Sequence, residues 1–455
     1  MSEPGQLHLI GVGGSGMLPL ALLLKQAGHP VTGRDAFCPP ERLALLEAHG
    51  ITVHSEADPA RVKDADCVVV SPAIPETDVE RRAARRDGVT VKTRFKMLAE
   101  LIAERLNVCV AGSHGKSTTT AMLVHILSSA GQDDFGYMLG ASFAAPDSAP
   151  ARLGAPHALF VTEACEAYGA LAHWQPAHAI LTNLDDDHAD HYGGQPGLTQ
   201  AFASFLSRLP KDGVAVACGD DPRVVEILRE ARCSALTYGF GDQNRLRAVL
   251  DTDGRATVFL DGRELGPLVL RVPGNHNLLN GLAALGIALT LGVGFPTAAG
   301  ALAEFDGIQR RLQRIPTENG LTIFDDFAHH PTAIKTTLAG LRAKVGDGKI
   351  IAIIEPRSNT MKQGVHQQTL LPSAETADRI LWANLNNMDW LPELIAGWQA
   401  LNAESDRHRV AATVEDLLAR TLEDLPSPCH IVIMSNGGFG GIHGKLIAEL
   451  ERIRG

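Results

Sequence analysis

The stretch from Val108 to Ala121, VCVAGSHGKSTTTA, constrains the fold more than any other part of the sequence. Its apolar start at 108–111 predicts a short buried parallel strand, and the turn GSHGKS then opens onto a helix that begins in threonines. Glycines let backbone N–H groups turn toward an anion, and the helix N-terminus adds a partial positive charge. Lys116 supplies a point charge, and the Ser117 hydroxyl can ligate Mg²⁺. The order of these parts predicts a phosphate-binding loop and disfavours an ordinary glycine-rich turn.

The loop is shorter than the usual phosphate loop. The usual spacing places a glycine and an intervening run before Gly-Lys-Ser, whereas position 110 is Val and the first glycine is Gly112. This shortening narrows the candidates among nucleotide-hydrolysing folds.

The length of 455 residues predicts two to four domains, since one core rarely grows past about 250–300 residues. A formal charge of −11 disfavours a general nucleic-acid binder, because such proteins neutralise phosphates with Lys and Arg. The seven cysteines contain no Cys-x-x-Cys pair, and no apolar run reaches membrane-spanning length. We therefore expect a soluble, cytoplasmic protein with reduced thiols, no membrane association and no obligate protein partner.

A second glycine-rich loop lies near the N-terminus. A strand expected over 7–12 leads through GVGGSG into a helix over 17–27, and Asp35 follows Gly16 by 19 residues. The glycines allow a pyrophosphate to approach, and the carboxylate can reach a ribose. The pattern leaves open an NAD-type cofactor, another nucleotide diphosphate, or a structural turn. A further strand over 67–70 ends at Ser71, where such sheets place ligands.

Two more strands end in polar residues at the expected edge of the central sheet. The strand over 158–162 precedes Glu163, and the strand over 179–182 precedes the loop that contains His188. Beside a phosphate loop, both residues are candidate metal ligands, and the alternatives are a surface carboxylate and a loop histidine.

A strand expected over 268–272 leads into PGNHNLLN. Asn277 and Asn280 share a helical face there, and they can bond a base edge or cap the helix.

The alternation of strands and helices restarts after a boundary near 307–316. Strands are expected over 321–324, 349–354 and 429–434, and a final helix reaches Arg454. The three strands are followed by the loops DDFAHHP, EPRSNTMK and SNGGFGGIH. Polar loops at one edge of a parallel sheet predict an α/β domain with a ligand at that edge.

Five landmarks in this order resemble the Mur ligase family over the whole chain: GVGGSGM, AGSHGKSTTTAM, TNLDDDHAD, PGNHNLLNGLAAL and FDDFAHHPTAIKTTL. The family comprises ATP-dependent amide-bond-forming ligases of peptidoglycan synthesis and recycling. The resemblance implies an α/β fold of three domains: a Rossmann-like UDP-binding domain over 1–106, a central phosphate-loop ATPase domain with a parallel sheet over 107–314, and a C-terminal Rossmann-like α/β domain over 315–455. It also implies that the substrates include UDP-N-acetylmuramate and ATP, that Mg²⁺ is the metal, and that the N-terminal glycine loop is a UDP site.

The mechanism that the resemblance implies passes through an acyl phosphate. The carboxylate of UDP-N-acetylmuramate attacks the γ-phosphorus of ATP, and an amine then expels phosphate. Lys116 would contact the β- and γ-phosphates, and His330 would lie near the reacting carboxylate. Ser117 and Glu163 would hold one Mg²⁺, and His188 would help to hold a second metal although Mg²⁺ prefers oxygen ligands.

The resemblance also assigns the nucleotide sites residue by residue. The implied ATP-binding residues are Gly112, Ser113, His114, Gly115, Lys116, Ser117, Thr118, His276, Asn277, Asn280, Arg311 and Asp326. The implied UDP-sugar-binding residues are Gly13, Gly14, Ser15, Gly16, Asp35 and Ser71. Since Arg311 and Asp326 belong to the third domain, ATP binding is expected to require domain closure.

Two loops decide the expected acceptor. Residues 355–362 and 435–443 resemble the branch of the family that attaches the recovered murein tripeptide L-alanyl-γ-D-glutamyl-meso-diaminopimelate. The expected function is therefore ligation of this tripeptide to UDP-N-acetylmuramate in murein recycling. The alternative is the biosynthetic ligation of L-alanine. The implied peptide-binding residues are Arg357, Ser358, Asn359, Lys362, Ser435, Asn436 and His443, of which Arg357 suits a carboxylate.

The chain departs from the family pattern near the expected metal. Cys165 and Tyr168 stand where relatives usually have aspartates, whereas Glu163 and Glu166 are retained. A second departure from several relatives is that no lysine occurs between His188 and Pro210. Two other classes of protein each agree with part of the sequence. An NAD-dependent dehydrogenase leaves the phosphate loop unexplained. A nucleotide-gated regulatory module is motivated by the missing aspartates.

Overall fold

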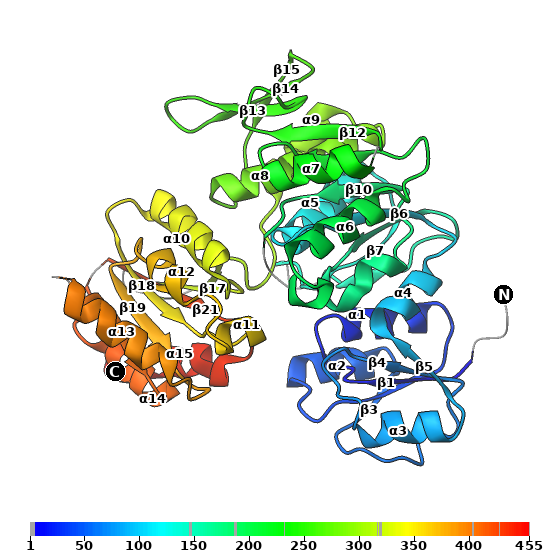
Figure 1. Ribbon diagram of the computed structural model, residues 1–455, viewed down its shortest axis with the longest axis horizontal. Helices are drawn as coiled ribbons and strands as arrows, with labels where there is room; N and C mark the ends of the chain where they lie inside the picture. Colours follow the sequence, from blue (N-terminus) through cyan, green and yellow to red (C-terminus); the bar gives the residue numbers. More distant parts are fainter. Residues whose placement is uncertain are drawn as a thin grey trace. The chain divides into compact units, whose positions relative to one another are not determined.

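Three sheets, each built from alternating strands and helices, form the computed structural model of the chain (Figure 1). The structure describes residues 5–144, 148–185, 189–231, 233–315, 317, 321–402, 405–426 and 428–454. It divides into two compact units, Met1–Arg271 with Leu278–Asp306, and Val272–Asn277 with Gly307–Gly455. Within the described ranges, no helix is both long enough and apolar enough to cross a membrane. All seven cysteines are free thiols.

The N-terminal sheet is fully parallel, in the order β3-β2-β1-β4-β5. Its strands are β1 (Leu7–Ile10), β2 (Val31–Arg34), β3 (Thr52–His54), β4 (Cys67–Val70) and β5 (Thr90–Thr93), and its helices are α1 (Met17–Gln26), α2 (Pro40–Ala48), α3 (Val79–Arg86) and α4 (Arg94–Leu101). Leu9 packs toward α1 and α4, whereas Ile10 joins the cluster with α3, as the alternation of strand side chains requires. The loop after β1 therefore lies where the strand order reverses direction, the usual ligand position.

The central sheet has ten strands in the order β15-β14-β13-β12-β11-β10-β6-β9-β7-β8. Its strands are β6 (Leu106–Ala111), β7 (Gly136–Met138), β8 (Ala151–Arg152), β9 (Leu159–Glu163), β10 (His178–Leu181), β11 (Ala215–Cys218), β12 (Ala235–Gly239), β13 (Leu246–Leu250), β14 (Ala256–Leu260) and β15 (Arg263–Leu268). The strands next to β6 are both parallel to it. The loops after β6, β9 and β10 consequently meet at one edge of the sheet.

Helices cover both faces of the central sheet. They are α5 (Lys116–Ser129), α6 (Gln195–Leu206), α7 (Pro222–Ala231), α8 (Asn275–Thr290) and α9 (Phe295–Glu304). Phe202 of α6 and Ile227 of α7 are fully buried with Cys109 of β6. Gly286 of α8 lies against Val216 of β11, where a Cβ would come within 2.8 Å of the valine side chain. Glycine at this position lets α8 approach the sheet closely.

The C-terminal sheet has the order β16-β17-β21-β18-β19-β20, with only β16 antiparallel. Its strands are β16 (Gln313–Ile315), β17 (Leu321–Asp326), β18 (Lys349–Ile354), β19 (Arg379–Ala383), β20 (His408–Ala411) and β21 (Cys429–Met434). Its helices are α10 (Pro331–Val345), α11 (Asn359–Lys362), α12 (Gln367–Ser373), α13 (Trp390–Leu401), α14 (Val414–Leu422) and α15 (Ile442–Arg454). Helices α10, α12 and α13 cover one face and α14 and α15 the other (Figure 1).

The α/β fold class predicted from the sequence is confirmed. One expected strand is wrong: the segment 268–272 is irregular, because β15 ends at Leu268 after pairing with β14. Val269 is 62% exposed, and the chain passes from one compact unit to the other close by, at Val272. The apolar residues of the segment 268–272 therefore form the end of a hairpin strand and the irregular segment that connects it to α8.

Candidate functional site

The phosphate loop has the conformation that its sequence predicts. It joins the buried strand β6 to α5, and Gly115 precedes the helix with a φ of +83°. Gly112 has a φ of +125°, and a Cβ there would lie 2.2 Å from the Thr182 hydroxyl. Only glycine tolerates both a positive φ and the lack of space for a Cβ. The conformation of the loop therefore follows from the positions of its glycines.

Lys116 is the first residue of α5, and its ammonium is folded back into the loop. Its Nζ donates to the Ser113 carbonyl at 3.0 Å and to Glu166 Oε2 at 2.9 Å. Burial lowers the pKa of Lys116, but the charges of Glu166, Cys165 and Glu163 outweigh it and raise the pKa overall. Lys116 is therefore a fixed cation at this edge of the sheet.

Ser117 and Glu163 bring two oxygen donors together. The Ser117 hydroxyl donates to Glu163 Oε2 at 2.8 Å, and the Gly140 N–H donates to Glu163 Oε1 at 2.7 Å. A hydroxyl and a carboxylate are hard ligands of the kind that Mg²⁺ takes in nucleotide sites. The residue pair therefore fits the metal expected from the sequence.

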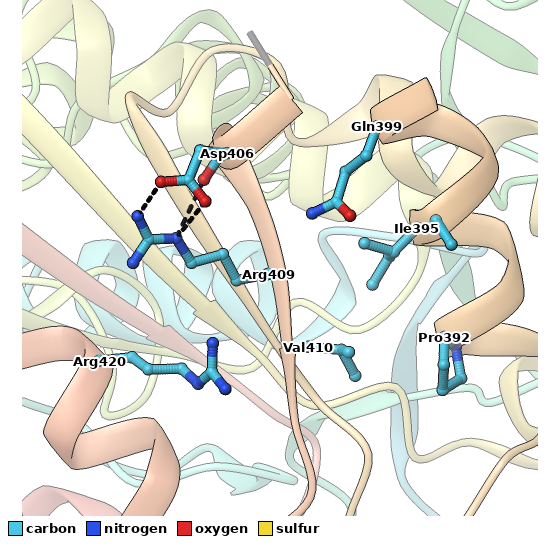
Figure 2. A pocket seen from close by; sticks show the side chains of 8 residues that line it. Pro392, Ile395, Gln399, Asp406, Arg409, Val410 and Arg420 are labelled. Atoms are coloured by element: carbon cyan, nitrogen blue, oxygen red, sulfur yellow. Dashed lines mark hydrogen bonds and ion pairs between the residues drawn. The ribbon is translucent and has the colours of Figure 1, made fainter. Parts of the chain in front are cut away.

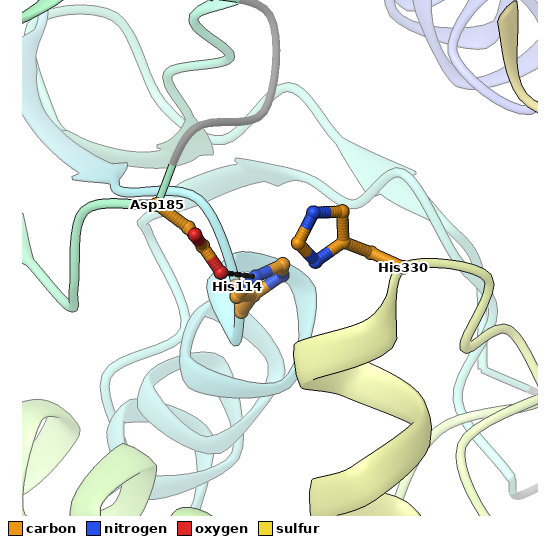
Figure 3. A group of neighbouring side chains, drawn as sticks. All are labelled: His114, Asp185 and His330. Carbon is orange, nitrogen blue, oxygen red and sulfur yellow. Dashed lines mark hydrogen bonds and ion pairs between the residues drawn. The ribbon is translucent and has the colours of Figure 1, made fainter. Parts of the chain in front are cut away.

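The loop after β10 supports the phosphate loop from its other side. Asn183 accepts from the His114 N–H at 2.8 Å and donates to the His114 carbonyl at 3.1 Å. His114 Nε2 lies 3.1 Å from Asp185 Oδ2 (Figure 3), and the Asp185 N–H donates to the Ser113 hydroxyl at 2.8 Å. His188, the expected second metal ligand, lies outside the described residues.

Asn280 of α8 lies against the phosphate loop. Its Oδ1 accepts from the Thr119 hydroxyl at 3.2 Å, and a Cβ on Gly115 would lie 2.4 Å from it. Thr118, the threonine implied in ATP binding, is buried in the first turn of α5. The structure therefore brings Asn280 and the loop together.

The N-terminal glycine loop is shaped by Asp35 and Ser71. Asp35 Oδ2 accepts a hydrogen bond from the Gly13 N–H at 2.9 Å. One oxygen of this carboxylate therefore stabilises the conformation of the loop. Gly11 has a φ of +82°, and a Cβ on it would meet the Ser71 side chain at 3.0 Å. The predicted UDP-sugar residues, which follow β1, β2 and β4, thus lie together at one edge of the sheet.

Two residues implied in ATP binding lie in the C-terminal unit, the buried Asp326 and the half-buried His276. Asp326 accepts from the N–H of Leu312 at 2.7 Å and from the N–H of Ala328 at 2.8 Å. Burial raises the pKa of its carboxyl, while Arg311 and these hydrogen bonds act in the opposite direction. Burial, together with the charge of Arg311, lowers the pKa of His276 to about 4. His276 is therefore neutral near pH 7.

Asn277 and Arg311 complete this group. Asn277 Nδ2 donates to the Pro273 carbonyl at 2.7 Å, and the Arg311 Cζ lies 5.1 Å from the ring centre of Phe327. His330 is the N-cap of α10 (Figure 3), and its ring centre lies 4.5 Å from that of His366.

The loop after β21 is held by residues to which the sequence assigned no role. Ser435 donates to the buried Glu355 carboxylate and accepts from the Gly437 N–H at 2.9 Å. The Arg310 guanidinium donates to the carbonyls of Ser435 at 2.6 Å and Gly437 at 2.8 Å. His443 pairs with Asp325 at 3.1 Å. Sequence reasoning missed Arg310, Glu355 and Asp325 because their roles depend on contacts between loops.

The loop after β18 supplies the other expected acceptor residues. The exposed Arg357 lies so close to Gly437 that any Cβ there would collide with its guanidinium. Ser358 Oγ lies 3.1 Å from the Thr360 hydroxyl, and the Lys362 carbonyl accepts from the Trp390 indole at 3.0 Å. Asn359 begins α11, and Asn436 is half-buried in the opposite loop.

A hollow of about 520 Å³ lies elsewhere, between α13, β20 and α14 (Figure 2). Its charged groups have partners, since Arg409 pairs with Asp406 of the lining, and Arg420 pairs at 2.7 Å with Asp416 of its own helix. None of the predicted site residues lines it, so we assign no function to it.

These features define a nucleotide-binding α/β protein with a phosphate loop and a second glycine-rich anion loop. Three family models match consecutive parts of the chain: "Mur ligase family, catalytic domain" over residues 6–106, "Mur ligase middle domain" over 110–288 and "Mur ligase, glutamate ligase domain" over 310–437. The chain belongs to the Mur ligase family, and it is accordingly an ATP-dependent amide-bond-forming ligase.

Individual relatives cover most of the chain. It is 39% identical to a UDP-N-acetylmuramate–L-alanine ligase of Solidesulfovibrio magneticus, over 77% of both chains. It is 34% identical to the ligase of the same name of Burkholderia thailandensis, over 98% of both chains. The crystal structure of a murein peptide ligase from Psychrobacter arcticus superposes with a TM-score of 0.77 at 32% identity, covering 98% of both chains.

The expectation of a tripeptide acceptor is contradicted by these relatives. Curated relatives 34–39% identical over most of the chain carry the name UDP-N-acetylmuramate–L-alanine ligase. The tripeptide prediction rested on the loops at 355–362 and 435–443. In the second loop, the side chains of Ser435 and His443 bond to residues of the same domain, so their presence alone does not specify a peptide.

Proposed function

We propose that the chain joins L-alanine to UDP-N-acetylmuramate at the expense of ATP, as a step of peptidoglycan synthesis. The observation that carries the proposal is the cluster of Lys116, Ser117 and Glu163 at one edge of the central sheet. This cluster offers a fixed cation and two oxygen ligands where a triphosphate would lie. The names of the curated relatives support L-alanine as the acceptor.

The proposed reaction has two steps. A carboxylate oxygen of UDP-N-acetylmuramate attacks the γ-phosphorus of ATP, and the bond to the β–γ bridging oxygen breaks to release ADP. The amine of L-alanine then attacks the acyl carbon, loses a proton and expels phosphate together with that carboxylate oxygen. Lys116 neutralises charge on the transferring group, and the glycine loop's N–H groups hold it in place.

Mg²⁺ would be held by Ser117 and Glu163, with His188 proposed as a ligand of a second ion. When bound, the metal neutralises phosphate charge and polarises the transferring group. Glu163 is already oriented by the Gly140 N–H, so its free lone pairs are directed before the metal arrives.

The remaining site residues are proposed to bind the two nucleotides and the reacting carboxylate. The ATP site comprises Gly112, Ser113, His114, Gly115, Lys116, Ser117, Thr118, His276, Asn277, Asn280, Arg311 and Asp326. The UDP-sugar site comprises Gly13, Gly14, Ser15, Gly16, Asp35 and Ser71. His330 serves the reacting carboxylate. We further propose domains over 1–106, 107–314 and 315–455, which the three family matches support.

Arg357 is proposed to bind the carboxylate of L-alanine. Its guanidinium is exposed beside Gly437, and the loop of Gly437 is fixed by Arg310. A planar guanidinium on a fixed loop suits two-point binding of a carboxylate. Ser358, Asn359, Lys362 and Asn436 would complete this side of the acceptor site, and Ser435 and His443, which bond within the domain, would hold its loop in position.

Isotope transfer tests the acyl-phosphate step. UDP-N-acetylmuramate labelled with ¹⁸O in its carboxylate is incubated with ATP, Mg²⁺ and L-alanine, and the released phosphate is analysed by mass spectrometry. We expect one ¹⁸O per phosphate, because the carboxylate oxygen leaves with it. Unlabelled phosphate would contradict the proposal. Unlabelled substrate in H₂¹⁸O serves as the control, in which no label should enter the phosphate.

A further inference from the structure

Arg94 begins α4 and lies directly against the N-terminal glycine loop. A Cβ added to Gly16 would be 2.7 Å from Arg94 Nη1, 2.8 Å from Cζ and 2.9 Å from Nε. These nearly equal distances mean that the flat guanidinium covers the Cα of Gly16. The adjacent Phe95 ring supports it, with its centre 4.0 Å from Cζ.

This guanidinium has no counter-ion among the described residues. Burial lowers the pKa of Arg94, while the charges of Cys165 and Glu163 act in the opposite direction. Arg34 in the same sheet shows the usual arrangement, since it pairs with Glu80 at 2.6 Å and with Asp78. A half-buried cation that lacks an anion is incompletely compensated for its loss of water, so Arg94 is suited to an anion that arrives with a ligand.

The glycine loop presents donors at the same place. Helix α1 begins after Gly16, which makes no side-chain capping bond. In the described part of the chain, the N–H groups of Met17 and Leu18 bond to the Gly14 carbonyl, whereas no acceptor is found for those of Ser15 and Gly16. Unpaired N–H groups at a helix N-terminus attract anions.

We propose that Arg94 binds the diphosphate of the sugar nucleotide, opposite the free N–H groups of Ser15 and Gly16. The inference rests on the proposed function, which brings a UDP-sugar to this loop. The diphosphate is the matching group because Arg94 lies at the start of α1, where the helix dipole favours negative charge. A guanidinium can bind two phosphate oxygens at once.

Titration calorimetry with UDP tests the assignment. Arg94→Ala should weaken UDP binding at least about tenfold, as expected for loss of a charge-assisted contact, and leave ATP binding unchanged. Lys96→Ala is the matched control, because it removes an exposed cation from the same helix. UDP affinity within twofold of wild type in Arg94→Ala would overturn the inference. Failure of the wild-type protein to bind UDP would instead overturn the proposed function on which it rests.

Arg94→Lys guards against a misfolded variant, because it keeps a positive charge at the start of α4. It should bind UDP more tightly than Arg94→Ala and less tightly than the wild type, since lysine keeps the charge but lacks the planar fork. UDP affinity of Arg94→Lys equal to that of the wild type would contradict binding by the guanidinium fork, and circular dichroism of both variants checks their folding.

Discussion

The two glycine-rich loops of the first unit occupy similar positions between a strand and a helix. They differ in where the positively charged side chains beside them come from. Each follows a buried parallel strand and precedes a helix, β1 with α1 and β6 with α5. The central loop carries Lys116 in its own sequence and pairs it with Glu166 at 2.9 Å. The N-terminal loop has no lysine, and the cations beside it come from other elements: Arg94 from α4, and Arg42 from α2, which donates to the Gly13 carbonyl at 2.8 Å.

This difference separates two kinds of anion site. A loop that carries its own lysine can neutralise charge on a group that is being transferred. A loop of N–H groups with a guanidinium beside it is suited to holding a diphosphate that does not react. We therefore expect substitutions in the central loop to affect turnover, and substitutions in the N-terminal loop to affect binding of the sugar nucleotide.

The largest effect is expected for Lys116→Ala. Removing the ammonium should lower ligation at least about 10³-fold, because the charge of the transferring phosphoryl group is no longer neutralised. UDP affinity should remain unchanged. The measurement is phosphate release under saturating substrates, with circular dichroism as a check of folding. Turnover near the wild-type rate would show that Lys116 does not take part in phosphoryl transfer. It would also contradict the proposed functional difference between the two loops.

Glu163→Gln should lower turnover about 10²-fold and raise the Mg²⁺ concentration needed for half-maximal rate, because a ligand charge is lost. Gln retains the acceptor for the Gly140 N–H, so the local structure should persist. Titration of the rate with Mg²⁺ provides the test. An unchanged Mg²⁺ dependence would mean that Glu163 does not hold the metal.

Asp35→Ala should weaken UDP binding about tenfold, since the Gly13 N–H loses its charged acceptor and the loop loses its shape. The maximal rate at saturating UDP-N-acetylmuramate should stay within a few-fold of wild type. Asp35→Asn, which keeps an oxygen acceptor, is the control and should bind more tightly than the alanine variant. A fall in maximal rate without a change in binding would reverse the roles assigned to the two loops.

The smallest effect is expected for Tyr192→Phe. The Tyr192 hydroxyl lies 2.5 Å from the Glu166 carbonyl, which accepts its hydrogen bond, and loss of this bond should reduce the free energy of unfolding by about 1 kcal/mol. Turnover should fall only slightly and UDP binding not at all. Urea denaturation measures the first effect. Equal stability of the two proteins would show that Tyr192 does not support the residue that pairs with Lys116.

The parts of the site that depend on neighbouring residues in sequence were predictable. Gly112, Gly115 and Lys116 occupy consecutive positions of one loop, and the loop's conformation follows from glycine's access to positive φ. The strands over 67–70, 349–354 and 429–434 were predicted with the observed bounds, because they are continuous apolar runs.

The partners that come from distant segments were not predictable. Glu166, Asn183 and Arg310 act through contacts that depend on strand order, and a single sequence does not reveal that order. The acceptor prediction was wrong for a related reason. Loops of similar composition can recognise different amines, because specificity depends on a few contacts at the site.

The most direct test of the account is the identity of the acceptor. Phosphate release from ATP is measured with Mg²⁺ and UDP-N-acetylmuramate, and either L-alanine or L-alanyl-γ-D-glutamyl-meso-diaminopimelate is added. Reactions without UDP-N-acetylmuramate serve as the control. We predict release that depends on L-alanine and a product of the corresponding mass. Release only with the tripeptide would contradict the account.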